Sequence, residues 1–182
     1  MPTKTPVVEP WRSFFREIDS SLAAEVVLHC LDGFVMTMLY GSNRLTADVD
    51  VLPITSNEES ENLVHLAGQG SKLHKKHKIY IQVVGVVTVP DNYEARLTEI
   101  FEGSFTNLRL FAMDPYDLAL SKLERNAPRD REDFKHLAQT IPLDLNILQE
   151  RYREELRPYL GNPRREDLTL KLWIETAQEQ VK

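Results

Sequence analysis

The 182-residue sequence contains a single cysteine, Cys30, and therefore cannot form an internal disulfide. Its seven glycines and ten prolines are too few for a fibrous or low-complexity chain. No apolar run approaches the roughly 20 residues that a membrane-spanning helix needs. Residues 1–10 also lack the apolar stretch of a signal peptide. From these absences we expect a cytoplasmic protein in a reducing compartment, with no membrane partner.

Positive charge is not in excess either. The chain has 22 Lys and Arg against 28 Asp and Glu, for a formal charge of −6. Neither residues 1–113 nor residues 114–182 carry a net positive charge, so neither segment is a basic nucleic-acid-binding module as a whole. The P-loop and G-x-G-x-x-G motifs do not occur, so P-loop and dinucleotide-binding folds are unsupported.

Residues 1–113 show the pattern of a small α/β unit. Trp11, Phe14, Phe15 and Ile18 recur at the spacing of one apolar helix face. Ser56 and Glu59 form a capping box, which predicts a helix that runs to about residue 68. Short apolar and β-branched runs predict strands over 25–31, 48–52, 79–89 and 108–111, with 79–89 as the central strand.

The pattern changes at Asp114-Pro115, which is typical of a helix start. Everything beyond is helical by pattern, over about 115–126, 129–140, 145–157 and 163–180. We therefore predict two parts: an α/β core over 1–113, with a small mixed sheet flanked by helices, and a C-terminal helical segment over 114–182 packed on that core.

Two acids in the predicted strand 48–52 are the most informative feature. Asp48 and Asp50 lie two residues apart, so both carboxylates project from one face of the strand. Two close carboxylates repel each other unless a cation lies between them, and Mg²⁺ prefers such hard oxygen ligands. The pair therefore suits metal-assisted phosphoryl or nucleotidyl transfer. The alternative is an ordinary strand with its polar residues directed outward.

The surrounding sequence carries a family resemblance. A strand, Gly33, a short helix and the stretch GSNRLTADVDVL resemble the start of the polymerase-beta-type nucleotidyltransferase fold, and more specifically the minimal nucleotidyltransferases of the AbiEii/AbiGii toxin type. The resemblance implies a turn whose N–H groups bind the triphosphate, and an acidic pair that binds Mg²⁺ or Mn²⁺. We place this turn at Asp32-Gly33, because Gly41-Ser42 lies too close to Asp48 to leave room for the intervening helix.

The same resemblance assigns the residues before the acids. Ser42, Arg44 and Thr46 correspond to an R-x-T element and would contact the nucleotide. Arg44 is the best candidate for a triphosphate or acid-orienting contact, since its planar fork matches phosphate oxygens. The alternative is a simple salt bridge from Arg44 to Asp48 or Asp50.

A second region of resemblance is DPYDLALSKLERNAPRDREDF, in residues 114–134. Here the family likeness implies that Lys122 reaches the nucleotide phosphates in a catalytic role. Arg129, Asp130 and Asp133 would orient the nucleotide or brace the site, and their spacing allows one helix face to carry all three. The alternative is a solvated charged face, which is the interpretation we prefer for Arg125 and Glu132.

Two departures from the family pattern bear on catalysis. Asp32 stands where relatives have Gly or Ser in the phosphate turn. Gln82 stands where active members supply a third carboxylate from a later strand, and a neutral amide is a weak metal ligand and no general base. Asp91 or Glu99 would replace it only if the fold brought one of them to the site.

The one concentrated basic segment is Lys72–Lys78, KLHKKHK. It would suit a nucleic-acid acceptor such as a tRNA end, whose phosphates attract lysine. The interpretation we prefer is a solvated loop.

These observations give two hypotheses of different classes. The first is a Mg²⁺-dependent nucleotidyltransferase that moves a nucleotidyl group from an NTP to a protein or RNA acceptor; by resemblance, it would be the toxin of a toxin–antitoxin pair, with a cognate antitoxin as partner. The second is a catalytically silent protein of the same fold that binds a nucleotide or a partner.

Overall fold

A computed structural model describes residues 7–53 and 56–179. The chain forms two compact units. Of the described residues, 7–39, 43–85 and 97–113 belong to the first unit, and 40–42, 86–96 and 114–179 belong to the second. Each unit therefore includes segments that are distant in sequence, and each is described by itself below.

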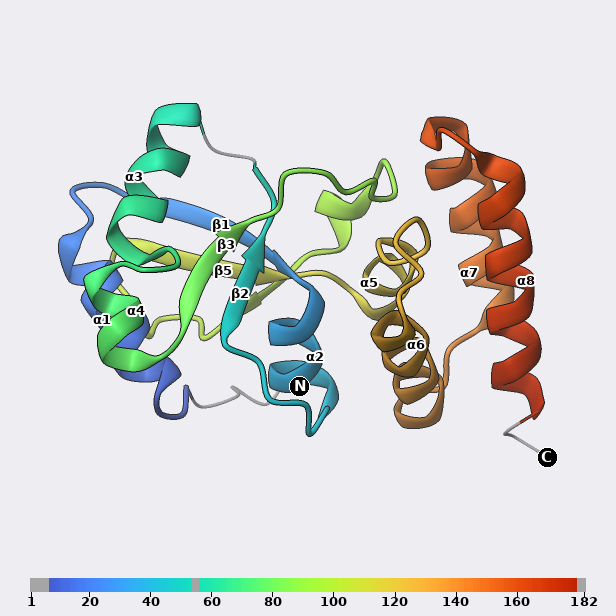
Figure 1. Ribbon diagram of the computed structural model, residues 1–182, viewed down its shortest axis with the longest axis horizontal. Coiled ribbons are helices and arrows are strands. Elements are labelled where there is room, and N and C mark those ends of the chain that lie inside the picture. Colours follow the sequence, from blue (N-terminus) through green and yellow to red (C-terminus); the bar gives the residue numbers. More distant parts are fainter. Residues whose placement is uncertain (1–6, 54–55, 180–182) are drawn as a thin grey trace. The chain divides into compact units, whose positions relative to one another are not determined.

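The first unit is built on a mixed sheet, which confirms the predicted fold class. Its five strands in the described residues lie in the order β3-β2-β1-β5-β4 (Figure 1). They are β1 (Val26–Leu31), β2 (Asp48–Val51), β3 (Tyr80–Val83), β4 (Thr98–Ile100) and β5 (Leu108–Ala112). The pairs β1–β5 and β2–β3 are parallel, whereas β1–β2 and β4–β5 are antiparallel.

Helices pack against this sheet around an aromatic core. They are α1 (Trp11–Ser21), α2 (Asp32–Tyr40), α3 (Asn57–Ala67) and α4 (Lys72–His77). The predicted apolar face of α1 is confirmed, because its four large side chains are buried. Phe34 of α2 joins them through ring contacts with Trp11 and Phe15. The capping box of Ser56 and Glu59 at the start of α3 is also confirmed.

Three predictions for this unit are wrong. The strand expected over 79–89 is only Tyr80–Val83, and β3 lies at an edge of the sheet. Among the described residues its sole partner is β2, which is four residues long, so the β-branched residues beyond Val83 have no strand there to pair with. The solvated loop expected at 72–78 is the helix α4, which Ser71 caps by accepting the His74 N–H. The pattern also missed β4, whose three residues are too few to show an alternation.

The second unit is helical beyond Asp114. It contains α5 (Pro115–Leu120), α6 (Pro128–Thr140), α7 (Leu145–Arg151) and α8 (Pro163–Glu179). The predicted start at Asp114 is confirmed, since its carboxylate accepts the Asp117 N–H at 2.8 Å.

Two of the predicted helices are shorter than expected. The helix expected over 115–126 ends at Leu120 and continues as tight turns, and Asn126 adopts a left-handed conformation with φ 42°. The helix expected over 145–157 changes at Tyr152 into a π turn (Tyr152–Leu156) and then a 3-10 turn (Arg157–Tyr159). Pro158 lies in that last turn and cannot donate the N–H that a regular helix requires.

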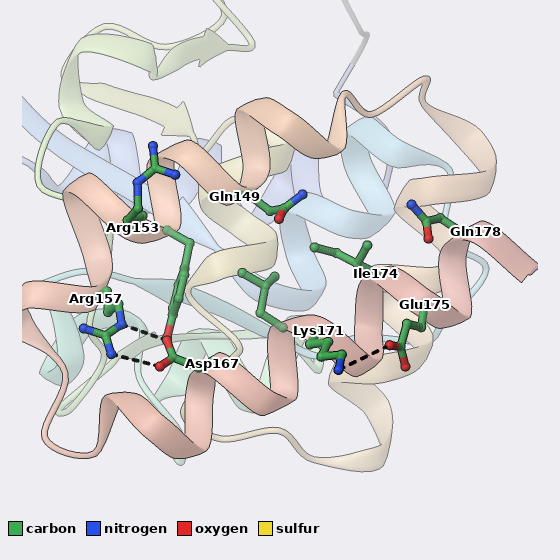
Figure 2. A pocket seen from close by; sticks show the side chains of 10 residues that line it. Gln149, Arg153, Arg157, Asp167, Lys171, Ile174, Glu175 and Gln178 are labelled. Carbon is green, nitrogen blue, oxygen red and sulfur yellow. Dashed lines mark hydrogen bonds and ion pairs between the residues drawn. The ribbon is translucent and has the colours of Figure 1, made fainter.

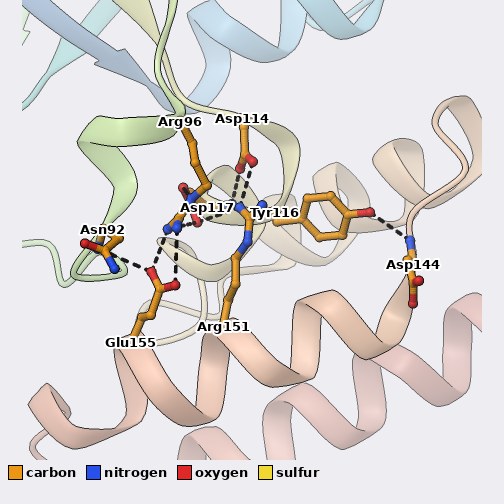
Figure 3. A network of polar contacts seen from close by, with 8 residues as sticks. All are labelled: Asn92, Arg96, Asp114, Tyr116, Asp117, Asp144, Arg151 and Glu155. Carbon is orange, nitrogen blue, oxygen red and sulfur yellow. Dashed lines mark hydrogen bonds and ion pairs between the residues drawn. The ribbon is translucent and has the colours of Figure 1, made fainter.

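An ion-pair network fixes the second unit (Figure 3). Arg96, in the 3-10 turn Tyr93–Arg96, donates to both oxygens of Asp117 at 2.7 and 3.0 Å and to Glu155 at 2.7 Å. Arg151 donates to Asp114 at 2.6 Å and to Asp117 at 3.1 Å. Burial raises the pKa of Asp117, while Arg96 and Arg151 oppose that shift. The network thereby joins α5, α7 and the 3-10 turn.

Among the described residues, no helix is long and apolar enough to cross a membrane.

Candidate functional site

The two acids of β2 lie in one row with residues of the neighbouring strands. Asp50 is in register with Leu31 of β1 and with Gln82 of β3, and Asp48 is in register with Tyr80. Residues in register project to the same face of a sheet, and alternate residues project to the other. The structure therefore confirms that Asp48 and Asp50 share a face.

The carboxylates of this row act on the groups around them. Burial raises the pKa of Tyr80, and the negative charges of Asp48 and Asp50 raise it further. Burial likewise raises the pKa of the Cys30 thiol, with a smaller contribution from Asp50. Asp48 accepts a hydrogen bond from the Thr46 hydroxyl at 2.8 Å. The row is thus a concentration of negative charge that suits a cation.

The turn between β1 and α2 lies beside this row. Asp32 follows the last residue of β1 and has φ 56°, the left-handed region. At Gly33, a Cβ atom would overlap the guanidinium of Arg44 and would lie 3.2 Å from the Thr46 hydroxyl oxygen. Because glycine alone leaves this space, it allows Arg44 and Thr46 to approach the start of α2. The structure thus brings together Gly33, Arg44, Thr46 and Asp48.

Arg44 and Asp32 form an ion pair in this turn, with 3.8 Å between Nη2 and Oδ1. The carboxylate of Asp32, which departs from the family pattern, therefore has a cation next to it. Its position in the first turn of α2 is also favourable, because a helix N-terminus stabilises negative charge. Ser42 belongs to the second unit, whereas Arg44 and Thr46 lie in the first unit together with Asp48 and Asp50.

The second set of predicted site residues lies in the second unit. Lys122 is buried, and its ammonium group donates to Asp133 Oδ2 at 2.9 Å. Asp130 is also buried and accepts the Ala127 N–H at 2.8 Å, which caps α6.

Arg125 and Arg129 are both exposed in this region. Arg125 forms a two-point ion pair with buried Asp130. Arg129, Asp130 and Asp133 all lie in α6, where Asp130 and Asp133 are buried.

The expected place of a third carboxylate holds Gln82, in register with Asp50 and exposed. Glu99 does not replace it. It lies on β4 at the opposite edge of the sheet, separated from β2 by β1 and β5, and it is paired with Arg109 at 3.0 Å. Asp91 belongs to the second unit.

Sequence reasoning missed Tyr80 as a member of the site. Its hydroxyl-bearing ring lies next to Asp48 in register and responds to both carboxylates. The available signal was its spacing, because Tyr80 and Gln82 alternate along β3 as Asp48 and Asp50 do along β2.

The second unit also contains a pocket of about 540 Å³ between the α7–π-turn segment and α8 (Figure 2). Tyr152 and Leu170 form part of its wall, and the Arg157–Asp167 ion pair closes one end at 2.8 and 2.9 Å. No residue of the predicted site lines this pocket.

The family comparison covers both units. The family model described as "Nucleotidyltransferase of unknown function (DUF6036)" matches residues 21–182. The chain belongs to this family. The DUF6036 match includes the acidic row of β2, the Gly33 turn and the buried charges of α6. It names no toxin, so the likeness to AbiEii/AbiGii proteins stays a prediction. No curated protein and no solved structure matches the chain.

Proposed function

We propose that this DUF6036 protein is a Mg²⁺- or Mn²⁺-dependent nucleotidyltransferase that moves a nucleotidyl group from an NTP to a protein or RNA acceptor. The observation that carries the proposal is the position of Gly33, Arg44 and Thr46 beside the acidic row of β2. A phosphate-binding turn next to a pair of carboxylates is the arrangement that a metal–triphosphate complex requires.

The donor set fits such a metal. Asp48 and Asp50 offer hard carboxylate oxygens, and Mg²⁺ typically takes one or two carboxylates together with substrate phosphates. The ion would supply neutralisation of the triphosphate charge when bound. The start of α2 at Gly33 and the guanidinium of Arg44 would bind the phosphate oxygens.

By the family resemblance, the proposal also assigns nucleotide contacts to Ser42, Lys122, Arg129, Asp130 and Asp133. In the transfer itself, the acceptor hydroxyl oxygen bonds to the α-phosphorus as the α–β bridging bond breaks, which releases pyrophosphate and the hydroxyl proton. The residues of the turn hold the triphosphate in place for this exchange.

The test is a titration of the purified protein with each NTP in MgCl₂ or MnCl₂. Asp48→Asn/Asp50→Asn should lose metal-dependent NTP binding by at least about a hundredfold, because both ligand charges are removed. Glu58→Gln/Glu61→Gln is the matched control, since it removes two exposed acids of the same unit. Equal NTP binding by wild type and the Asp48/Asp50 variant would refute the site.

A second function of the same fold is favoured by one observation, the register of Gln82 with Asp50. With an amide in place of a third carboxylate, the protein would bind a nucleotide or a partner without transfer. Labelled NTP with an RNA or protein acceptor distinguishes the two. Transfer by the wild type supports the enzyme, whereas an inert wild type and a gain of transfer in Gln82→Asp support the silent protein.

The resemblance to AbiEii/AbiGii proteins extends the proposal to a toxin role with a cognate antitoxin. Induced expression should then arrest bacterial growth, and Asp48→Asn/Asp50→Asn should abolish the arrest. Growth arrest that persists at equal expression of this variant would contradict a toxic nucleotidyl transfer.

A further inference from the structure

Helix α4 gathers lysines on an exposed surface of the first unit. Lys72, Lys75 and Lys76 lie at i, i+3 and i+4, the spacing of one helix face. Lys78 follows at the C-cap with φ 63°. All four lysines are exposed, while Leu73 is buried and anchors the helix on its other side.

Most of this positive charge is not compensated within the unit. Glu17 of α1 pairs with Lys76 at 2.5 Å and with His77 at 2.9 Å. In the part of the chain that the structure describes, no acidic side chain forms an ion pair with Lys72, Lys75 or Lys78. The basic surface of α4, defined as Lys72, Lys75 and Lys78, is therefore available to an external anion.

This surface adjoins the acidic row. After Lys78 the chain passes through Ile79 directly into β3, whose first residue is Tyr80. The His74 ring of α4 contacts the Tyr80 ring at 4.9 Å between centroids, and Tyr80 is in register with Asp48. A half-exposed aromatic ring thus lies next to both α4 and the acidic row.

We propose that the basic surface of α4 and Tyr80 bind a single-stranded nucleic acid and direct its end to the acidic row. The inference rests on the proposed function and selects, from its two acceptor classes, RNA over protein. Lysines attract successive backbone phosphates, and a base stacks on the neighbouring aromatic ring.

Binding is measured by fluorescence anisotropy with a labelled single-stranded RNA of mixed sequence, without NTP, at several salt concentrations. Lys72→Gln/Lys75→Gln/Lys78→Gln should weaken binding at least about tenfold and should lower the log–log salt slope by about 2, at about 0.7 per neutralised phosphate. Tyr80→Leu should weaken binding about tenfold with the slope unchanged, because stacking carries no charge.

The matched control is Arg153→Gln/Arg164→Gln/Lys171→Gln, which removes the same charge from exposed positions of the second unit. It should stay within about twofold of wild type in RNA affinity, and thermal melting should show that each variant is folded. An equal loss in both triple variants would overturn the inference, because it would show a response to total charge alone.

Two further ligands show which chemical group the basic surface recognises. A DNA strand of the same sequence that binds equally well supports recognition of the shared phosphodiester chemistry, and preference for RNA supports a contact with the 2′-hydroxyl. A polyglutamate peptide of equal charge that competes as well as RNA would overturn the inference in favour of an acidic protein partner.

The outcome is separable from that of the proposed function. A wild type that binds NTP and Mg²⁺ but no RNA would overturn the acceptor surface and leave the metal–nucleotide site intact. A wild type that binds RNA through α4 but no NTP would support the surface and refute the proposed function.

Discussion

The two units differ in how they place their buried and half-buried carboxylates. In the second unit, carboxylates are matched by cations: Lys122 meets Asp133, Arg125 meets Asp130, and Arg96 and Arg151 both meet Asp117. In the first unit, Asp48 and Asp50 are neighbours in one row beside Tyr80 and Gln82.

Paired charges and neighbouring like charges affect the stability of the folded state differently. An opposite pair at close range compensates for the loss of water, so removing one partner leaves a costly buried charge. The carboxylates of Asp48 and Asp50 repel each other, which favours a cation between them. This row is consistent with a site that is completed by an external cation.

The largest effect on stability is expected for Lys122→Met in the second unit. This change keeps the side-chain volume but leaves buried Asp133 without the Lys122 ammonium, so the free energy of unfolding should fall by about 3 kcal/mol. Urea denaturation measures it. Lys122→Met/Asp133→Leu should recover most of the loss, whereas Arg153→Met, at an exposed pair, should cost less than about 0.5 kcal/mol. A loss for Lys122→Met no greater than that for Arg153→Met would refute the stabilising role of the pair.

The next effect is on nucleotide affinity in the first unit, through Gly33→Ala. The added methyl group displaces the Arg44 guanidinium from the start of α2, so NTP affinity in Mg²⁺ should fall about tenfold, or about 1.4 kcal/mol. Stability should change by less than about 1 kcal/mol, because the guanidinium is the end of a flexible side chain that can move away. Gly85→Ala, in open space, is the control. A large loss of stability with unchanged NTP affinity would show that Gly33 serves the fold and not nucleotide binding.

A smaller effect is expected for Asp19, whose carboxylate is satisfied by the backbone. Its carboxylate accepts N–H groups of Thr106, Asn107 and Leu108 at 2.6 to 3.1 Å. Burial acts to raise the pKa of Asp19, but these donors outweigh it and hold the pKa below its ordinary value. A lowered pKa in the folded state adds stability above the unfolded value, near 3.8, and that stability is lost as pH falls through the folded value.

Asp19→Asn should therefore lower the free energy of unfolding by about 1 kcal/mol at pH 7, and the difference from wild type should shrink as pH falls below 3.8. Urea denaturation at a series of pH values measures it. A difference that stays constant down to pH 2 would show that the charge of Asp19 is not responsible.

The smallest effect on stability is expected for Asp48→Asn/Asp50→Asn. Because the change relieves repulsion between like charges, the free energy of unfolding should stay within about 1 kcal/mol of wild type or rise. Urea denaturation without metal measures this difference in the free energy of unfolding. A loss as large as that of Lys122→Met would remove the contrast between the units and would make the acidic row part of the fold's stability.

Local patterns predicted much of the architecture. The apolar face of α1, the capping box of α3 and the Asp114 start of α5 depend on residues within a few positions of one another, so the sequence displays them directly. The mixed α/β class and the shared face of Asp48 and Asp50 follow from the same short-range periodicities.

The predictions were wrong where contacts between segments distant in sequence influence the local structure. The β-branched run after Ile79 has the propensity of a long central strand, but β2 provides only four residues for pairing. The lysine-rich segment 72–78 has the composition of a loop, yet burial of Leu73 and the cap at Ser71 make it a helix.

The sequence by itself therefore determined many of the elements of this protein and the pair of acids on one strand, since both follow from the geometry of neighbouring residues. Only the tertiary structure decided that Gln82 and Tyr80 stand in register with those acids, that Gly33 admits Arg44, and that Lys122 is paired with Asp133. The physical reason is that register, close approach and charge pairing depend on which segments meet in space, which local periodicity does not encode.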